Sequence, residues 1–267
     1  PNLSPAAQQA RQKFATPYYG FVNLAMATLA YTDEKASDIK NVYRDMPAIA
    51  AGMPPLPGPT LGSAPLTGAW RIDWGPCVTD TNSNLLFAAS FYETGGDTPV
   101  VTWISVRGTD TSSGVVGLFQ QIEEDIDVRH TVAFPLGTPV QIARGTAEGL
   151  DRLLALQPRS SAATPQAGLG TILSYAQFVA AKDPATPIIV TGHSLGGCQT
   201  TVLALYLKRA LPAANIIPAS FAAPTAGLAD FAAAFDAAFP NATQWWNTFD
   251  VVPNAFASGP AEIGRAH

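Results

Sequence analysis

Charged side chains are scarce in this sequence of 267 residues, where they make up 13 % of the total against 47 % hydrophobic residues. An average globular domain carries about 25 % charged residues, and disordered or coiled-coil chains carry more. The composition therefore indicates a compact globular protein. Lysine and arginine number 15 against 20 acidic residues, and no run of five basic residues occurs. Nucleic-acid binding is not expected.

Cysteine and long apolar runs are also rare. Cys77 and Cys198 allow at most one disulfide, which excludes a disulfide-stapled scaffold and a four-cysteine zinc site. No apolar run reaches the roughly 18 residues that a membrane-spanning helix needs, so no transmembrane segment is expected. The chain begins at Pro1 without a charged segment followed by an apolar one. We expect any targeting segment to lie outside this sequence, and the shortage of charge favours secretion.

The first part of the chain changes from helical to strand-like spacing. Residues 4–16 and 18–31 carry apolar side chains at helical spacing, with Pro17 between them. Residues 51–68 are rich in proline and glycine, which predicts an ordered surface loop. Three β-rich runs separated by turn residues then predict a strand meander, at 69–78, 84–93 and 99–106.

The later part alternates helical and strand patterns in the order helix, helix, strand, helix, strand, helix, strand. Such alternation indicates parallel strands covered by helices. Residues 187–191 are a β-branched run typical of a strand buried on both faces. Residues 216–221 and 242–249 are further strand candidates, and Pro218 argues against a fully regular strand there. We expect one domain over residues 1–267 with an α/β fold, in which helices flank a mostly parallel central sheet.

Residues 188–197 carry the most informative motif, Ile-Ile-Val-Thr-Gly-His-Ser-Leu-Gly-Gly. A β-branched strand runs straight into Gly-x-Ser-x-Gly and then into a helix, which is the pattern of a nucleophile elbow. This turn exposes the Ser194 hydroxyl at the carboxyl edge of the sheet, and it needs glycines because larger side chains would clash there. Ser194 also lies at a helix N-terminus, which stabilises developing negative charge. The Leu195 N–H is therefore the first candidate oxyanion donor.

With this elbow the sequence resembles the class 3, or fungal-lipase-like, family of α/β-hydrolases. The similarity continues upstream in residues 103–109, Trp-Ile-Ser-Val-Arg-Gly-Thr, and downstream in 221–227, Phe-Ala-Ala-Pro-Thr-Ala-Gly, and 249–253, Phe-Asp-Val-Val-Pro. The resemblance implies an α/β-hydrolase fold, with N-terminal helices and the strand meander flanking the sheet. It also implies that Thr109 is the second oxyanion donor, through its N–H and hydroxyl. Ala222 departs from the family, which usually has glycine at that position.

A serine nucleophile needs an acid and a base, and in α/β-hydrolases the order along the chain is Ser, then Asp or Glu, then His. Asp250 follows a strand-like segment, so we expect it at the catalytic edge of the sheet. Asp230 and Asp236 fall within a helical pattern, and Asp183 precedes its strand, at the wrong end. Asp250 is therefore the predicted acid; its alternative role is to cap a turn.

The base must be chosen from three histidines. His193 lies beside the nucleophile with its side chain expected to point elsewhere, and His130 precedes Ser194 in a strand-like stretch where a packed or surface histidine is the ordinary interpretation. His267 alone follows Asp250. We predict His267 as the base; the alternative is that the catalytic histidine lies outside this sequence.

Residues 111–124 interleave glycines with apolar side chains where the resembled family carries its lid. Glycine hinges around an apolar helix suit a mobile flap, and an ordinary packed helix is the alternative. Residues 122–126 match the family's Trp-x-x-Asp-Leu only loosely. The neighbouring acidic side chains suit a solvated face or a structural carboxylate better than a cation site, so no metal is assigned. They are Glu123, Glu124, Asp125 and Asp127.

The predicted activity is that of a serine hydrolase, which cleaves carboxylic esters through an acyl-enzyme without a cofactor. The resemblance implies acylglycerols or similar lipid esters as substrates, met at an oil–water interface, and hence a role in lipid degradation. Two alternatives stay open: a short-chain esterase or thioesterase of the same fold, and a non-catalytic hydrolase-like binding module. Nucleotide binding is excluded because residues 192–197 lack the lysine and the glycine spacing that phosphates require. The sequence does not indicate which oligomeric state the protein has.

Overall fold

The computed structural model describes residues 3–31, 39–79, 84–108, 127, 130–158, 170–250 and 252–253. Its strands are β1 (Gly68–Val78), β2 (Leu85–Glu93), β3 (Pro99–Arg107), β4 (Thr131–Ala133), β5 (Gln141–Ala143), β6 (Pro187–His193), β7 (Asn215–Phe221) and β8 (Thr243–Trp245). Its helices are α1 (Pro5–Arg11), α2 (Gly20–Leu29), α3 (Ile39–Ala51), α5 (Arg144–Ala155), α6 (Ile172–Lys182), α7 (Leu195–Ala210) and α8 (Ala229–Ala238), with a 3-10 turn at Pro17–Tyr19.

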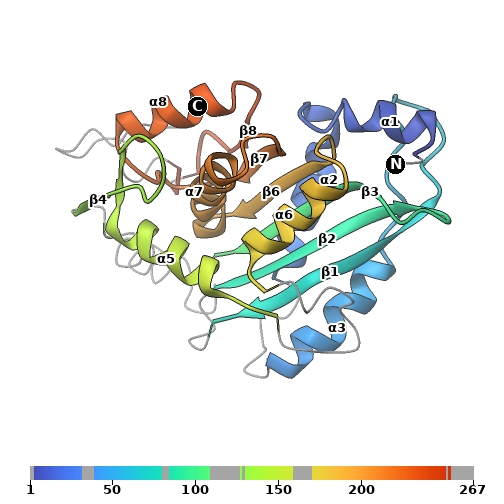
Figure 1. Ribbon diagram of the computed structural model, residues 1–267, viewed down its shortest axis with the longest axis horizontal. Helices are drawn as coiled ribbons and strands as arrows, with labels where there is room; N and C mark the ends of the chain where they lie inside the picture. Colours follow the sequence, from blue (N-terminus) through green and yellow to red (C-terminus); the bar gives the residue numbers. More distant parts are fainter. Residues whose placement is uncertain are drawn as a thin grey trace.

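The described strands form a central sheet in the order β1-β2-β3-β6-β7-β8, and β4 pairs separately with β5. β1, β2 and β3 are antiparallel neighbours, which confirms the predicted meander. β3, β6, β7 and β8 pair in parallel, as the alternation of helices and strands predicts. Parallel neighbours need crossover connections, and α7 and α8 supply two of them (Figure 1). The result is an α/β-hydrolase-like fold with a mostly parallel sheet.

The expected irregularity at Pro218 does not occur. Pro218 pairs with Val190 in an unbroken register between β6 and β7. β8 is short and pairs only with Ala219, Ser220 and Phe221 on its side of β7. Because the β8 pairing begins after Pro218, the missing proline N–H removes no β7–β8 hydrogen bond. The strand therefore continues through the proline.

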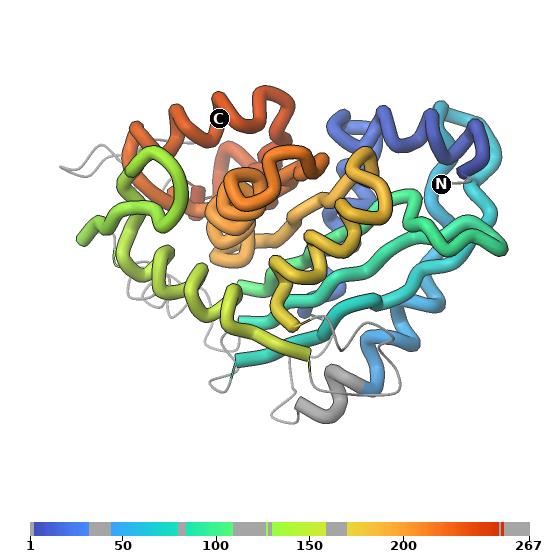
Figure 2. The backbone as a smooth tube through the Cα atoms, viewed as in Figure 1, coloured from blue at the N-terminus to red at the C-terminus, as the bar shows by residue number. Residues whose placement is uncertain are grey.

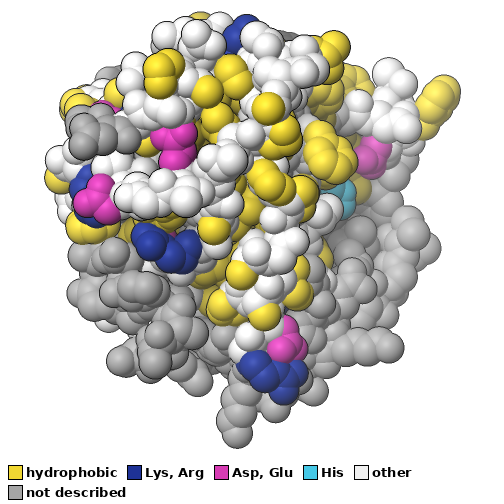
Figure 3. Space-filling model, turned by 90° about the vertical axis from the view of Figure 1, so that its right-hand side faces the viewer, with side chains coloured by type: hydrophobic (Ala, Val, Ile, Leu, Met, Phe, Trp, Pro, Cys, Tyr) yellow, Lys and Arg dark blue, Asp and Glu magenta, His cyan; other side chains and the backbone are white. Residues whose placement is uncertain are grey.

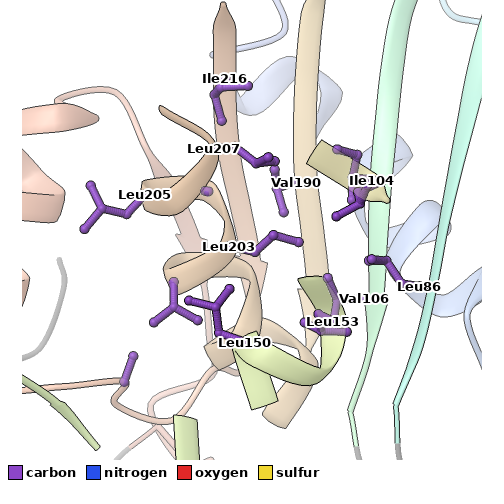
Figure 4. Close-up of a cluster of buried hydrophobic side chains, with 14 of the residues drawn as sticks. Leu86, Ile104, Val106, Leu150, Leu153, Val190, Leu203, Leu205, Leu207 and Ile216 are labelled. Carbon is purple, nitrogen blue, oxygen red and sulfur yellow. The ribbon is translucent and has the colours of Figure 1, made fainter. Parts of the chain in front are cut away.

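Helices cover both faces of the sheet, so its central strands are buried on both sides. α5, α6 and α7 lie on one face, and α2 and α3 lie on the other (Figure 1). Successive residues of β6 alternate between two hydrophobic clusters: Ile188 and Val190 pack under α7, and Ile189 packs under the N-terminal helices. Figure 4 shows how side chains from α5 and α7 meet those of the strands in the first cluster.

The N-terminal segment largely follows the sequence-based expectation. α1, the 3-10 turn and α2 correspond to the two predicted helical pieces, and the turn begins at Pro17. The proline-rich segment is an ordered loop, in which the Pro54 carbonyl accepts a hydrogen bond from Trp70 Nε1 at 2.8 Å. α3 is an additional helix that the sequence patterns do not predict, because Pro47 lies within it.

The chain passes from β6 directly into α7, an orange segment that can be followed through the middle of Figure 2. None of the described helices combines the length and the apolar character that crossing a bilayer requires. Both cysteines are buried free thiols, so they do not pair. Burial raises the pKa of Cys198 to about 12, which fits the small core residue expected there.

Candidate active site

The carboxyl ends of the parallel strands meet at one edge of the sheet. His193 at the end of β6 pairs with Phe221 at the end of β7, and Phe221 pairs with Trp245 at the end of β8. On the other side of β6, Gly192 pairs with Val106 near the end of β3. In open α/β sheets ligands bind outside this edge. It is therefore the place to look for catalytic groups.

Ser194 occupies the sharp turn between β6 and α7, as the motif predicts. Its φ of 56° and ψ of −129° put it in a region that residues other than glycine rarely adopt, and a position of this kind costs about 1–3 kcal/mol. Three backbone hydrogen bonds hold it there: its N–H donates to the Phe221 carbonyl at 2.9 Å, and its carbonyl accepts from the N–H groups of Gly197 at 2.8 Å and Cys198 at 3.1 Å. The strained turn is fixed by the surrounding strands and helix.

The glycines of the motif are required by close backbone packing. A Cβ on Gly192 would lie 2.4 Å from the Gly196 carbonyl oxygen. A Cβ on Gly196 would lie 2.4 Å from the Val106 carbonyl oxygen and 2.7 Å from the Gly108 nitrogen. All three distances are far below normal van der Waals contact. Only hydrogen fits at these two positions, so the first turn of α7 can rest directly against the end of β3.

The Ser194 side chain is 6 % exposed, and within the described part of the chain its Oγ has no hydrogen-bond partner. Buried hydroxyls are normally paired, and exceptions of this kind are typical of catalytic groups. Leu195 is the first residue of α7, so its N–H belongs to the helical turn that has no intrahelical acceptors. The predicted nucleophile and the predicted oxyanion donor are thus adjacent at a helix N-terminus.

Asp250 lies five residues beyond Trp245, the last residue of β8. Its Oδ1 accepts a hydrogen bond from the Val252 N–H at 3.0 Å, so it also forms the turn that is its alternative role. The carboxylate is close enough to His193 to act on that ring: burial lowers the pKa of His193, and the Asp250 charge partly opposes this effect. His193 directly precedes Ser194, so the Asp250 charge acts on the residue next to the predicted nucleophile.

The two described histidines have other contacts. The His193 ring packs edge-on against Tyr31, with ring centroids 6.1 Å apart. The exposed His130 bonds through Nδ1 to Asp127 at 2.9 Å, and Asp127 also pairs with Arg144. Neither imidazole bonds to Ser194 Oγ. The other predicted site residues, Thr109 and His267, lie outside the described residues.

Three further expectations concern the other acidic residues, the lid and a metal ion. Asp230 lies in α8, as expected, and Asp183 directly follows α6 at the amino end of β6, where it pairs with Arg11 at 2.5 Å, as expected for a residue at the wrong end of the strand. The expected lid at 111–124 lies outside the described residues. In the part of the chain that the structure describes, no group of three or more histidine, cysteine or acidic side chains could hold a metal ion.

Two features of this site were not predicted from the sequence. The Tyr31 hydroxyl donates to the His193 carbonyl and accepts from the Gly108 N–H, each at 3.0 Å. No motif marks this tyrosine, because its partners lie far away in the sequence. Ala222 has a φ of 47°, a left-handed conformation that glycine adopts more easily. The backbone thus explains why a glycine is common at that position in the resembled family.

Comparison with known proteins agrees with this geometry. The sequence model of the family Lipase (class 3) matches residues 103–259. That match includes the ends of β3 and β6, the elbow and Asp250. A search of curated protein sequences finds no match.

Solved structures share the fold. A crystal structure of M37 lipase is similar at 25 % identity with a TM-score of 0.71, over 89 % of this chain and 69 % of that chain. Lipase II from Rhizopus niveus is similar at 16 % identity with a TM-score of 0.55, over 94 % and 76 %. A triacylglycerol lipase from Penicillium expansum is similar at 17 % identity with a TM-score of 0.51, over 92 % and 76 %.

Proposed function

The chain belongs to the class 3 lipase family and is a serine lipase hydrolase, and from this premise we propose that it cleaves acylglycerol esters through a triad of Ser194, Asp250 and His267. The observation that carries the proposal is the Ser194 hydroxyl, which is buried, without a partner in the described residues, and held on a strained elbow at the start of α7. A hydroxyl in this position is oriented for attack and lacks only its base.

The proposed reaction follows the usual order of acyl transfer. Ser194 Oγ attacks the acyl carbonyl while His267 takes its proton, and Asp250 orients and stabilises the imidazolium. The Leu195 N–H, with the N–H and hydroxyl of Thr109, stabilises the oxyanion. The leaving alcohol takes the proton from His267, and an acyl-enzyme remains. Water, deprotonated by His267, then attacks the acyl-enzyme; His267 returns that proton to Ser194 Oγ as the ester bond to the serine breaks and the fatty acid is released.

Labelling with a fluorophosphonate tests the nucleophile. We expect one adduct, on Ser194, located by sequencing the labelled peptide. Ser194→Ala should remove both the adduct and the esterase activity. Labelling at a different residue, or full activity of Ser194→Ala, would contradict the proposal.

Two histidine variants test the base. His267→Ala should lower kcat by about 10³- to 10⁴-fold, which is the scale of losses within such triads. His193→Gln serves as the comparison, because His193 is the other imidazole at this edge and its ring already packs on Tyr31. If His267→Ala keeps its activity and His193→Gln loses it, the base is His193 and the proposed triad is wrong.

Exposed aromatic and aliphatic side chains at the catalytic edge support a lipid substrate presented at an oil–water interface. Phe21 on α2 is 78 % exposed and Phe249 is 92 % exposed. α2 and β8 meet where the backbone of Gly20 approaches the Trp245 ring, so the two elements form one surface. The exposed apolar side chains on α2, at the end of β8 and in the segment after it are Phe21, Leu24, Trp245, Trp246 and Phe249. Figure 3 shows one face of the molecule on which hydrophobic side chains gather in a band. Exposed apolar patches of this kind are typical of interaction sites.

Rates measured across the solubility limit of a short triglyceride test the interface. We expect the rate to rise when droplets form. The double variant Phe21→Ser with Phe249→Ser should lose this rise and keep its rate on dissolved ester. Ile49→Ser is the matched control, because Ile49 is 41 % exposed on α3, which packs on β1 at the far edge of the sheet. A wild-type rate that does not rise with droplets would favour the short-chain esterase.

A further inference from the structure

Tyr31 connects the ends of two strands that carry the active site. Its hydroxyl donates a hydrogen bond to the His193 carbonyl at the end of β6, at 3.0 Å. The same hydroxyl accepts a hydrogen bond from the Gly108 N–H directly after β3, also at 3.0 Å. The His193 carbonyl belongs to the peptide that leads into Ser194. The tyrosine therefore contacts the backbone on both sides of the gap between β3 and the elbow.

The hydrogen-bonding capacity of the hydroxyl limits what it can do. A tyrosine hydroxyl has one proton, and here the proton is donated to the His193 carbonyl. It is not available to an oxyanion while that bond is intact. The Tyr31 ring also packs edge-on against the His193 ring. These contacts make Tyr31 a support for the backbone at the elbow.

The backbone that Tyr31 holds is next to the oxyanion donor. A Cβ on Gly108 would lie 2.6 Å from the Gly196 nitrogen and 3.1 Å from Leu195 Cβ. The peptide at Gly108 is thus in direct contact with the first turn of α7. A shift of Gly108 by a few tenths of an ångström would change the position of the α7 N-terminus relative to the end of β3. Oxyanion donors need their position fixed within about 0.5 Å to be effective.

Tyr31 is itself held by the way α2 is fixed to the sheet. Asn23 Oδ1 accepts from Trp103 Nε1 at 2.9 Å, and the Asn23 carbonyl accepts from Thr191 Oγ1 at 3.2 Å. One turn later, Ser105 Oγ donates to the Met26 carbonyl at 2.7 Å. These buried hydrogen bonds come from β3 and β6, the same two strands whose ends Tyr31 joins. α2 therefore ends in a fixed position, and Tyr31 follows two residues after Leu29.

We infer that Tyr31 is a positioning residue for ester hydrolysis, which holds Gly108 and the peptide before Ser194 in the geometry that the oxyanion site requires. The inference rests on the proposed function of Ser194. Tyr31 contributes in the transition state, where the backbone geometry determines how well the negative charge on the oxyanion is stabilised. Ground-state binding of the ester does not depend on it.

Tyr31→Phe tests the inference, because it removes the hydroxyl and keeps the ring against His193. Loss of two ordinary hydrogen bonds should lower kcat by about tenfold and leave KM within about twofold. The affinity for a boronic acid, which forms a tetrahedral adduct with an active serine, should fall by the same factor as kcat. All rates are divided by the number of active sites titrated with a fluorophosphonate, so that unfolded protein does not count.

Tyr18→Phe is the matched control. Its hydroxyl also donates to one backbone carbonyl, that of Gly58, at 3.0 Å, and it lies outside the proposed site. Tyr18→Phe should keep the wild-type kcat and boronic acid affinity. If Tyr31→Phe keeps the wild-type kcat and boronic acid affinity, the positioning role is wrong. It is also wrong if KM rises as strongly as kcat falls, because a general loss of folding would change both. If Ser194→Ala remains active, the proposed function itself fails, and the two results are thus distinguishable.

Discussion

Gly196 shows how the absence of a side chain at one position allows the geometry of the elbow. The residue lies in the first turn of α7, where a Cβ would meet backbone atoms of β3 and of Gly108 on two sides. A side-chain neighbour could rotate away, whereas these backbone neighbours belong to the central sheet. The space between α7 and the end of β3 is therefore closed to any side chain.

Gly196→Ala should damage both folding and activity. The added methyl group must move α7 away from Val106 and Gly108, which we expect to cost about 1–3 kcal/mol of unfolding free energy and most of the activity. Urea unfolding and fluorophosphonate labelling of Ser194 measure the two effects. Gly52→Ala is the control, because a Cβ there would meet its nearest neighbouring atom at an ordinary 3.5 Å. Equal stability of the two variants would refute the packing argument.

At the residue scale, local sequence patterns predict the nucleophile Ser194 but not Tyr31, which holds the backbone beside it. Ser194 and Leu195 are identified by five consecutive residues, because the elbow is a local backbone structure. Asp250 is predicted from the strand-like segment that precedes it, and its role as the acid stays a prediction. Tyr31 contacts His193 across 162 positions of sequence, and such a contact leaves no local signal. Thr109 and His267 stay predictions.

At the scale of elements, a buried polar network joins α6 to the antiparallel strands. Asp73 on β1 is 1 % exposed, and its carboxylate accepts from the Tyr92 hydroxyl at 2.5 Å and from Arg71 Nε at 2.7 Å. Tyr175 on α6 reaches the same carboxylate at 3.4 Å and Ser90 on β2 at 3.1 Å. Burial and the Asp73 charge raise the pKa of Tyr175 well above its ordinary value, so its hydroxyl keeps its proton.

Asp73→Ala should break this hydrogen-bond network and lower the free energy of unfolding. The change leaves the Tyr92 and Tyr175 hydroxyls without their shared acceptor, and a buried polar group left without its partner costs about 1–3 kcal/mol. Chemical denaturation measures this loss. The comparison is Asp45→Ala, whose carboxylate pairs with Arg44 on the exposed surface of α3 and whose loss should not be measurable. A loss at Asp73 as small as at Asp45 would show that the network is not important for stability.

Element prediction succeeds where periodicity is clear. β1, β2 and β3 agree with their predicted ranges within about one residue, because each is a β-rich run bounded by turn residues. β8 is shorter than predicted, ending at Trp245, since only three residues of β7 pair with it. α3 is missed because a proline normally ends a helix, and here Pro47 lies within one.

At the scale of the whole molecule, the site depends on two hydrophobic layers on opposite faces of one sheet. α7 rests on one face and α2 on the other, and both reach the carboxyl ends of β3 and β6. Ser194 directly precedes α7, and Tyr31 follows α2. Since the layers share the strands between them, cooperative unfolding of the sheet should remove the catalytic geometry in one step.

The pH dependence of stability follows from the position of His193 between these layers. Burial lowers the pKa of His193 from its ordinary value of 6.5 in the folded protein, and Asp250 raises it in part. The unfolded chain therefore binds this proton more readily than the folded protein. The contribution of the neutral His193 to the free energy of unfolding is fully present above pH 6.5. It is lost as the pH drops from 6.5 towards the lowered pKa of His193 in the folded protein.

Urea unfolding at a series of pH values between 8 and about 4 measures this effect of one buried imidazole. His193→Gln should remove the part of the slope that begins near pH 6.5. Asp250→Asn should have the opposite effect: without the carboxylate the folded-state pKa of His193 falls further, so the loss of stability continues to lower pH. If His193→Gln and the wild type decline in parallel below pH 6.5, the imidazole is not the group that couples this edge of the sheet to pH.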